Sequence, residues 1–261
     1  MADHTLKVTA IIPTFNEEEN IAKAIGSVHW ADEIIVIDSF STDNTVEITK
    51  GHQRVTLVQH EYKNSASQKN WIIPQAKYEW IFLLDADEYA TDDLVNEVQK
   101  VLASEPKHDG YWIRRKNFFM GRKINYSGWQ NDRVVRLFKR DTCRYEDKKV
   151  HAEIITNGSL GKLNEYIMHN TYKGLDHFIG KINWYSTWKA HDVIEKGKST
   201  NFFFNVIVKP WYRFFKHYIL RFGILDGKAG FVISILAGYD VMLRGIKIWR
   251  IKNGDQIKKD K

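Results

Sequence analysis

The sequence predicts an α/β fold in which a doubly wound, mixed but mostly parallel sheet (Rossmann-like) is followed by a helical extension. Strand and helix patterns alternate over about the first hundred residues, extended segments follow, and the chain turns helical after His169. A chain of 261 residues can bury a substantial core without disulfides. We therefore expect one large domain over residues 1–170 and an extension over residues 171–261.

β-Branched strands that alternate with amphipathic helices predict the parallel part of the sheet, with right-handed crossovers. The helix after the second strand is expected to be capped by Thr42 or Asp43, and the fourth helix by Asp92 or Asp93. The expected elements are strand 7–13, helix 17–28, strand 33–38, a helix ending at Thr49, strand 55–59, helix 65–76, strand 80–84 and helix 94–103.

Extended segments predict a mixed second half that is added to the edge of this sheet. Residues 111–118 and 133–138 read as strands, with turns at Met120-Gly121 and Ser127-Gly128. A helix is expected over residues 175–196. Two or three more helices are expected within residues 202–252, joined near Gly223 and Gly227.

Cysteine usage and hydropathy limit the cell compartment. The single cysteine, Cys143, indicates a reducing compartment, and we expect it to fill space on a strand rather than act as a nucleophile. The N-terminus lacks the basic start and apolar run of a signal peptide. The longest apolar run, residues 229–239, is shorter than the roughly 18 residues of a membrane span, so no spanning segment is expected.

Two closely spaced acids follow the apolar strand 80–84. An unpaired buried carboxylate is very costly, so Asp85 and Asp87 are expected where the strand leaves the core, at its carboxyl edge. Two such acids can share a hard divalent cation that also binds phosphate oxygens, which predicts a metal–diphosphate site. The alternative is a solvated turn or a helix cap.

Polar residues also follow the first and second strands, at 13–17 and 38–43. Because open α/β sheets bind ligands at the carboxyl ends of their strands, the three strand ends together predict a nucleotide pocket. Neither Gly26 nor Gly51 belongs to a glycine-rich phosphate loop. The sequence therefore favours a metal, rather than backbone amides, as the group that neutralises phosphate.

These motifs resemble those of the family 2 glycosyltransferases, which have the GT-A fold. The matching segments are 11–17, 34–43, 67–70 and 82–88. Within the family, the chain is most similar to the WaaE-like lipopolysaccharide-core β-glucosyltransferases. That likeness continues through 131–133, 145–147, 150–151 and the basic, aromatic tail.

The resemblance implies a donor-binding half over residues 1–105 and an acceptor-side half over residues 106–170. Asp87 would bind a divalent metal, Mg²⁺ or Mn²⁺. Asp85 would face the ribose or donor sugar and is a second candidate ligand. His169 is a third candidate ligand or a phosphate contact, although a lone histidine is more often structural. The implied donor-binding residues are Pro13, Thr14, Asn16, Glu17, Asp38, Lys69, Asp85, Ala86 and Asp87.

The resemblance also implies a general base beside the acceptor hydroxyl, since an inverting transfer needs one there. Asp147 is the first candidate and Glu146 the second. The alternative is that both acids pair with Lys148 and Lys149 on a surface turn. The WaaE-like group usually has Val-His-Glu after this point. Here Ala152 separates His151 from Glu153, so Glu153 would point to the other side of a strand.

The tail combines cations with aromatic residues. Residues 202–252 contain nine Lys or Arg and two acids, so this segment carries the entire formal excess of +7. The pattern favours a peripheral contact with an anionic membrane surface. Packing on the catalytic domain or a homodimer interface is the alternative. Nucleic-acid binding is disfavoured because no recognisable binding motif is present.

Together these features predict an inverting, metal-dependent glycosyltransferase that moves a sugar, with a hexose expected, from a nucleotide diphosphate donor. The expected acceptor is a lipopolysaccharide core or another lipid-linked glycan at the cytoplasmic face of the membrane. Two alternatives remain open. One is a nucleotidyltransferase that acts on a sugar phosphate, and the other is a membrane-attached binding protein without turnover.

Overall fold

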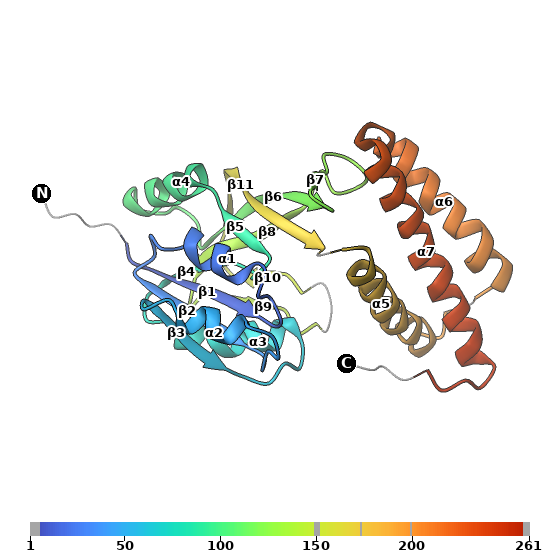
Figure 1. Cartoon of the computed structure of the whole chain (residues 1–261), viewed down its shortest axis with the longest axis horizontal. Coiled ribbons are helices and arrows are strands. Elements are labelled where there is room, and N and C mark those ends of the chain that lie inside the picture. The colour runs from blue at the N-terminus through green and yellow to red at the C-terminus, as the bar shows by residue number, and fades with distance from the viewer. Residues whose placement is uncertain (1–5, 149–151, 173, 199, 258–261) are drawn as a thin grey trace, which may run out of the picture. The chain divides into compact units, whose positions relative to one another are not determined.

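The structure is a computed structural model that describes residues 6–148, 152–172, 174–198 and 200–257 (Figure 1). The chain forms two compact units. The first contains the described residues up to Lys116 together with Asp132–His169, and the second contains Asn117–Asn131 and the described residues from Asn170 onward. Residues 117–131, which the sequence-based division assigned to the catalytic part, thus group with the helical unit.

A large mixed sheet forms the centre of the first unit, with the strand order β3-β2-β1-β4-β8-β6-β11-β5. Strands β3, β2, β1 and β4 are parallel, whereas β8 joins β4 in the antiparallel sense and β6 joins β8 likewise. The predicted fold class is confirmed. The strands are β1 Val8–Thr14, β2 Glu33–Asp38, β3 Val55–Gln59, β4 Trp80–Leu83, β5 Glu88–Ala90, β6 Gly110–Phe119, β8 Arg133–Lys139 and β11 Leu160–Tyr172.

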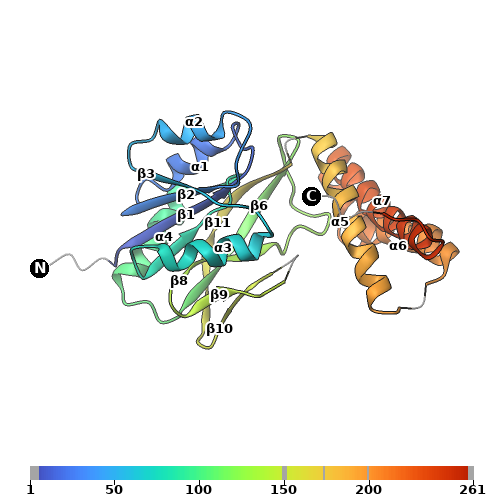
Figure 2. The same ribbon diagram turned by 90° about the horizontal axis from the view of Figure 1, so that it is seen from below.

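Successive residues of a strand point to opposite faces of the sheet. Both faces of this sheet therefore carry apolar side chains, and helices cover both. On β1, Ile12 belongs to the core that contains α1 and α4, whereas Ile11 belongs to the core that contains α3. Helices α1 and α3 accordingly lie on opposite sides of the strands (Figure 2). The helical segments are α1 Ile21–Ser27, α2 Thr45–Lys50, α3 Ser65–Ile72, η1 Ile73–Gln75 and α4 Asp92–Ala103.

A small antiparallel pair, β9 Cys143–Tyr145 and β10 Ile154–Thr156, packs against the α3 side of the sheet. Cys143 is buried on β9, in agreement with the expected filling role, and burial raises the pKa of its thiol. Neither feature is typical of a nucleophilic cysteine.

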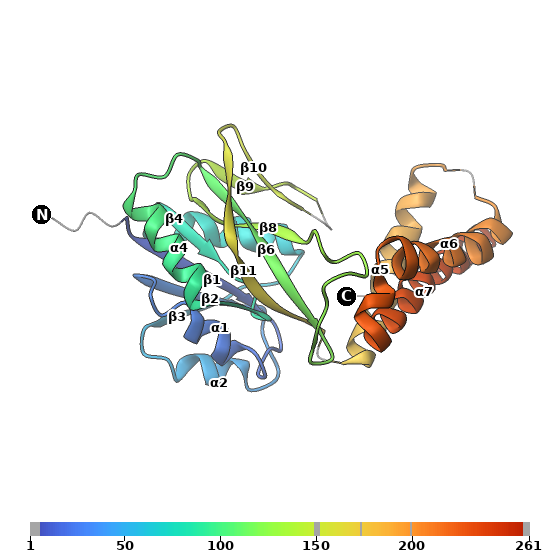
Figure 3. The same cartoon turned by 90° about the horizontal axis from the view of Figure 1, so that it is seen from above.

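The second unit is a helical bundle in which α5, α6 and α7 lie side by side (Figure 3). The helix that contains α6 includes a π-helical turn on each side, η2 and η3. Gly227 starts α7 with a φ of 61°, near the predicted junction. The elements are β7 Arg122–Lys123, α5 Leu175–Glu195, η2 Phe204–Val208, α6 Lys209–Phe215, η3 Lys216–Leu220, η4 Gly223–Asp226 and α7 Gly227–Lys252.

Several expectations need correction. Helix α4 begins two residues earlier than predicted, because the hydroxyl of Thr91, rather than Asp92 or Asp93, accepts a hydrogen bond from the amide of Leu94 at 3.3 Å. Asn44 is the N-cap residue of α2, although Asp43 does accept from the amide of Thr45 at 3.0 Å. Strands β5 and β11 were not predicted.

The hydropathy expectation also needs correction. Among the described residues, one helical stretch, Gly223–Lys252, is long and apolar enough to cross a membrane. Within its most apolar 18 residues, 39% is buried inside the protein. The expectation that no segment could span a membrane is therefore wrong by length and composition. A core helix of a soluble protein passes the same criteria.

Candidate functional site

The three strand ends that predicted a pocket meet at one edge of the sheet. The parallel pairing of β1 with β2 places Thr14 beside Asp38. Strand β4 lies on the other side of β1, and the amide of Leu84 donates to the carbonyl of Ile11 at 2.9 Å. The segment Asp85–Asp87 therefore leaves the sheet next to the first two strand ends.

Hydrogen bonds join the loop after β1 to the loop after β2. Asn16 has a φ of 53°, its amide donates to the hydroxyl of Ser41 at 2.8 Å, and its side-chain oxygen accepts from the amide of Thr42 at 2.8 Å. The amide of Glu17 donates to the hydroxyl of Thr45 at 2.7 Å. The candidates Asn16 and Glu17 are thus held in place by the loop after β2 and the start of α2.

Asp38 is fully buried at the end of β2. Its carboxylate accepts a hydrogen bond from the amide of Ser41 at 3.0 Å and from the side-chain amide of Gln59 at 3.0 Å, and it also contacts the Ser41 hydroxyl. Asp38 therefore holds the loop after β2 in this structure. The expected contact with a base or ribose stays a prediction, because it would add to these bonds or replace one of them.

The end of β1 supplies two further candidates. Pro13 is half-buried and Thr14 is buried. Among the described residues, the Thr14 hydroxyl oxygen has no hydrogen-bond partner. A buried hydroxyl without a partner is uncommon, and it is compatible with a polar group that arrives with a ligand.

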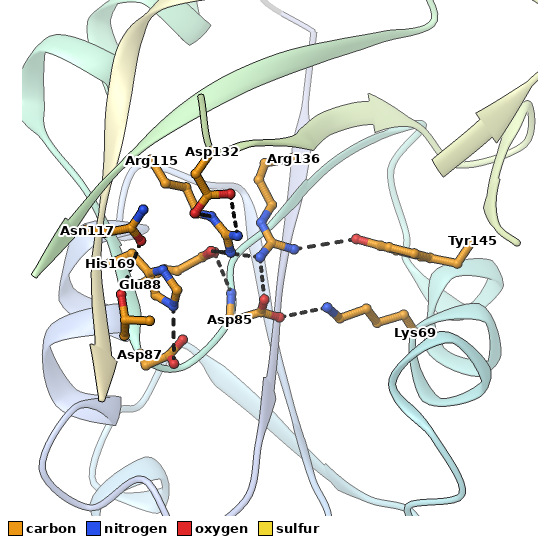
Figure 4. A network of polar contacts seen from close by, with 11 residues as sticks. Lys69, Asp85, Asp87, Glu88, Arg115, Asn117, Asp132, Arg136, Tyr145 and His169 are labelled. Carbon is orange, nitrogen blue, oxygen red and sulfur yellow. Dashed lines mark hydrogen bonds and ion pairs between the residues drawn. The ribbon is translucent and has the colours of Figure 1, made fainter. Parts of the chain in front are cut away.

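Asp85 forms the centre of a network of charged side chains (Figure 4). One of its oxygens lies 2.8 Å from the ammonium of Lys69 on α3, and the other contacts the guanidinium of Arg136 on β8. Burial alone would raise the pKa of Asp85, but the positive charges of Arg136 and Lys69 outweigh it and hold that pKa well below its usual range. Asp85 is therefore ionised and committed to two cations, which disfavours its expected role as a metal ligand.

The network continues through the fully buried carboxylate of Glu88. This carboxylate accepts from Arg136 at 2.8 Å, from Arg115 at 3.1 Å and from the amide of Asp85 at 3.1 Å. Arg115 in turn forms a two-pronged pair with Asp132 at 2.7 and 3.0 Å. Because three cations and three carboxylates alternate along the network, its charges compensate one another.

The segment 67–70 positions this network from α3. Ser67 completes a capping box with Asn64 at the start of the helix. Gln68 donates to the hydroxyl of Ser39 at 2.6 Å, and Lys69 reaches Asp85. Asn70 exchanges two hydrogen bonds, of 2.8 and 2.9 Å, with the backbone of Tyr145. Gln68, Lys69 and Asn70 thus connect α3 to the loop after β2, to Asp85 and to the end of β9.

The candidate bases follow Tyr145 directly. Glu146 is paired with the ammonium of Lys148 at 2.8 Å, and this hydrogen bond lowers the pKa of Glu146. The surface pairing considered above is thus present for Glu146. Asp147 is exposed in a bend of the chain. Glu153 is also exposed, whereas Lys149 and His151 lie outside the described residues.

Asp87 and His169 come together across β5 and β11. These strands pair with His169 opposite Glu88, so the imidazole approaches the neighbouring acid, and its Nε2 lies 3.4 Å from a carboxylate oxygen of Asp87. The side chain of Asp87 is 20% exposed and that of His169 is 12% exposed. The intervening Ala86 is buried.

The side chains of Asp87 and His169 suit a divalent cation that takes its remaining ligands from a bound substrate. Carboxylate oxygen and imidazole nitrogen are both ligands of Mn²⁺, and Mg²⁺ often takes only one or two carboxylates together with substrate phosphates. No group of three or more His, Cys, Asp or Glu side chains arranged for a metal occurs among the described residues. The predicted set of Asp85, Asp87 and His169 is therefore not assembled as such.

Comparison with known proteins identifies the family. The sequence model described as "Glycosyl transferase family 2" matches residues 9–187, which is more than half of the chain. The chain belongs to glycosyl transferase family 2. It is an enzyme that transfers glycosyl groups, as the motifs had predicted.

Two relatives of this glycosyltransferase cover nearly its whole length. The lipopolysaccharide core biosynthesis glycosyltransferase LpsC of Rhizobium meliloti is 27% identical over 254 residues, which cover 94% of this chain and 93% of LpsC. An uncharacterised glycosyltransferase of Rickettsia conorii is 29% identical over 261 residues, which cover 94% of this chain and 90% of its own.

Solved structures confirm the GT-A fold of this glycosyltransferase. The crystal structure of S. aureus TarS 1-349 in complex with UDP-GlcNAc matches with a TM-score of 0.52 and 15% identity. The match covers 97% of this chain and 93% of that chain. At such low identity the likeness concerns the fold alone.

Arg136, which pairs with Asp85 and Glu88, and Arg115, which pairs with Glu88 and Asp132, were not predicted from the sequence of this glycosyltransferase. A signal for Arg136 was present, since it is a charged residue within the otherwise apolar end of the strand 133–138. A buried charge on such a strand requires a partner. The partners, Asp85 and Glu88, are 51 and 48 residues away in the chain, and their identity needed the fold.

Proposed function

We propose that this glycosyltransferase transfers a hexose, with inversion, from a nucleotide diphosphate donor to a lipopolysaccharide core or another lipid-linked glycan. The relative named for lipopolysaccharide core biosynthesis, aligned over nearly the whole chain, supports this acceptor class. The observation that carries the proposal is the acid pair Asp85 and Asp87 at the carboxyl edge of the sheet, beside the cation Lys69.

In this proposal the donor lies over the ends of β1, β2 and β4. Asn16, Glu17 and Asp38 shape the side that receives the nucleoside. Lys69 and Arg136 provide positive charge near the diphosphate, while Asp85 fixes both cations and limits their repulsion. Fixed charges with little exposure to water stabilise charge that develops on a leaving group.

Asp87 and His169 would hold a divalent cation, Mg²⁺ or Mn²⁺, beside the diphosphate. When bound, such a cation would neutralise negative charge on the leaving nucleoside diphosphate. The partly exposed pair of oxygen and nitrogen ligands 3.4 Å apart supports this assignment. A cation that gains its remaining ligands from the donor also agrees with the lack of a complete set among the described residues.

Asp147 is proposed as the general base that takes the proton from the acceptor hydroxyl. It follows Tyr145, whose backbone is bound by Asn70 next to Lys69, so the bend that carries Asp147 begins beside the donor-binding residues. Glu146 is less suited, because its pairing with Lys148 lowers its pKa. A base with a lower pKa has less driving force for taking a proton.

We also propose that the enzyme works as a peripheral protein at the cytoplasmic face of the inner membrane, where a lipid-linked acceptor is accessible. The second unit exposes many large apolar side chains, among them Phe203, Trp211 and Leu225. Apolar side chains interleaved with cations suit the headgroup region of an anionic bilayer. Self-association into a homodimer would be a second use of the same surface.

The proposal is tested first by donor binding and then by product analysis. A panel of nucleotide sugars with Mn²⁺ should contain one that raises the melting temperature, because a ligand that binds only the folded state stabilises it. With that donor and a lipid-linked glycan acceptor, release of the nucleoside diphosphate supports glycosyl transfer. Release of pyrophosphate would instead indicate a nucleotidyltransferase. Donor binding without either product would indicate a binding protein.

A further inference from the structure

The helical unit contains a cavity of about 380 Å³ that is rich in cations and aromatic rings. It lies between the helix that contains α6 and helix α7, and four of its seven lining residues are positively charged. The lining residues are Phe204, Lys209, Tyr212, Arg213, Lys216, Val241 and Arg244.

Residues 202–252 contain two acids, and neither of them neutralises the positive charge of this cavity. Asp240 is paired with Lys189 on α5 at 3.1 Å. Asp226 accepts hydrogen bonds from the amides of Asn125 and Tyr126, at 3.0 Å each, and from the hydroxyl of Ser127 at 2.7 Å. Both carboxylates are therefore committed to other parts of the unit.

The four cations that line the cavity differ in their contacts. Lys209 is bound to the side-chain oxygen of Asn205 at 2.6 Å and lies over the ring of Phe204. In the part of the chain that the structure describes, no carboxylate pairs with Arg213, Lys216 or Arg244. Because three cations that line one cavity lack a carboxylate partner, an anion bound beside them would be stabilised.

The backbone builds this cavity at a place where the helix is not regular. Pro210 lacks an N–H group, and the amide of Lys209 reaches back five residues to the carbonyl of Phe204, which is a π-helical bond. A second such bond joins the amide of Arg221 to the carbonyl of Lys216 at 2.9 Å. Both π-helical turns contain a lining residue, and such turns are frequent at functional sites.

Two glycines of α7 allow close contact with the helix that contains α6. A Cβ on Gly238 would lie 3.0 Å from the carbonyl oxygen of Pro210, and one on Gly245 would lie 2.9 Å from that of Asn205. Val241 and Arg244 lie between these two glycines in the chain. The two helices thus approach closely through their backbones at Asn205 and Pro210, next to the lining residues Phe204 and Lys209.

The surroundings indicate an amphiphilic ligand rather than a soluble anion. Trp211 and Tyr212, on the same helix as three of the cations, are 70% and 58% exposed, and Phe215 is exposed beside them. Aromatic rings of this kind favour the interface between lipid headgroups and acyl chains. Arginine is well suited to phosphate because its guanidinium can donate two parallel hydrogen bonds.

We propose that this cavity binds the phosphate group of an anionic membrane lipid, with Arg213, Lys216 and Arg244 as the phosphate contacts and Tyr212 at the rim. The inference rests on the proposed function in so far as the acceptor is lipid-linked, and it adds a defined lipid site to a general attraction for anionic surfaces. A lipid held there would fix how the helical unit sits on the bilayer.

The test compares two triple variants of the full chain that lose the same charge. R213Q/K216Q/R244Q removes three of the four cavity cations, and K198Q/K228Q/K252Q removes three exposed lysines of the same unit. Binding is measured by flotation with phosphatidylcholine vesicles, with and without phosphatidic acid. We expect the cavity variant to lose at least about tenfold more affinity for the anionic vesicles than the control variant. Equal losses, or no loss in either variant, would overturn the proposal.

A second arm separates a lipid phosphate from a free phosphate ester. Short-chain phosphatidic acid should displace the protein from vesicles at far lower concentration than glycerol 3-phosphate, because only the lipid also contacts the aromatic rim. Equal potency of the two competitors would overturn the lipid assignment. If the triple variant does not fold, as judged by its melting curve, R244Q and K228Q alone provide the same comparison.

Donor binding distinguishes failure of this inference from failure of the proposed function. The cavity variant should keep the full thermal stabilisation by the nucleotide sugar, since no cavity residue belongs to the donor site. If the unaltered protein responds to no donor while the vesicle comparison holds, the proposed function fails and the lipid site stands. If donor binding holds and the two triple variants bind vesicles equally, the lipid site fails alone.

Discussion

The ammonium of Lys69 lies 2.8 Å from one oxygen of Asp85, while the other oxygen of Asp85 contacts the buried guanidinium of Arg136. One carboxylate therefore holds two cations at the carboxyl edge of the sheet. Without it, two buried positive charges would face each other in a medium that screens them poorly. Asp85 thus acts as the counter-ion that keeps these cations in place.

The pKa of Asp85 makes this arrangement sensitive to acid. Because the folded-state pKa lies below the ordinary value of 3.8, the unfolded chain binds a proton more readily than the folded chain between those two values. The stabilisation by Asp85 is therefore complete above about pH 4 and is lost as the pH falls below it.

Asp85→Asn removes this titration, so its free energy of unfolding should depend less steeply on pH below about pH 4 than that of the unaltered protein. Urea unfolding at several pH values between neutral and strongly acidic conditions measures both slopes. Identical slopes would show that Asp85 is not ionised against Lys69 and Arg136 in the folded protein.

Arg136→Met should destabilise the first unit strongly. The substitution leaves the fully buried Glu88 with Arg115 as its remaining cation and removes one partner of Asp85. Loss of one partner of a buried ion pair costs roughly 3–5 kcal/mol. Arg133→Met on the same strand is the control, because Arg133 is exposed and its removal should change stability by less than about 0.5 kcal/mol. Equal urea midpoints for the two variants would contradict the structural role of Arg136.

The parallel half of the fold could be predicted from the sequence in detail. The predicted strands 33–38 and 55–59 coincide with β2 and β3, because runs of β-branched residues between turn signals are distinctive. The strand ends then follow from topology, since parallel neighbours end at the same edge. The acid pair could be placed at this edge for that reason, whereas Lys69 was assigned to the same site through the family resemblance.

Long-range pairing could not be predicted. Strand β5 has three residues, and its pairing with β11 depends on a partner almost 80 residues further along the chain. That pairing brings His169 to Asp87. The sequence therefore named His169 as a candidate ligand but could not predict its contact with Asp87. The grouping of residues 117–131 with the helices likewise depends on Asp226, which binds two amides of this loop about 100 residues away.

Asp87→Asn and His169→Ala test the proposed cation site. Each removes one of two ligands, so the affinity for Mn²⁺ in the presence of the nucleoside diphosphate should fall by about a hundredfold. Asp93→Asn, an exposed acid in the first turn of α4, is the matched control. Calorimetric titration of Mn²⁺ measures the affinities. Retention of normal affinity by both site variants would place the cation elsewhere.

Asp147→Asn and Glu146→Gln separate the two candidate bases. Loss of a general base lowers kcat by about 10²–10⁴-fold, and we expect this for Asp147→Asn with unchanged donor binding. Glu146→Gln should reduce kcat much less, because that side chain is engaged by Lys148. Steady-state kinetics with saturating donor gives both values. The reverse order would identify Glu146 as the base, and two near-normal variants would exclude this segment from proton transfer.

A final prediction concerns the packing of the helical unit. A Cβ on Gly230 in α7 would lie 1.9 Å from the backbone oxygen of Gly223, whereas a Cβ on Gly180 in α5 would meet no atom within 4 Å. Alanine favours a helix interior over glycine by about 1 kcal/mol, so Gly180→Ala should stabilise the protein by up to that amount. Gly230→Ala gains the same helix propensity but must move η4 away from α7, and we expect a net loss of roughly 1–3 kcal/mol. Because propensity cancels between these variants, the difference in their unfolding free energies, measured in urea, isolates the cost of separating the two backbones. A difference near zero would mean that η4 does not pack against α7 as the structure describes.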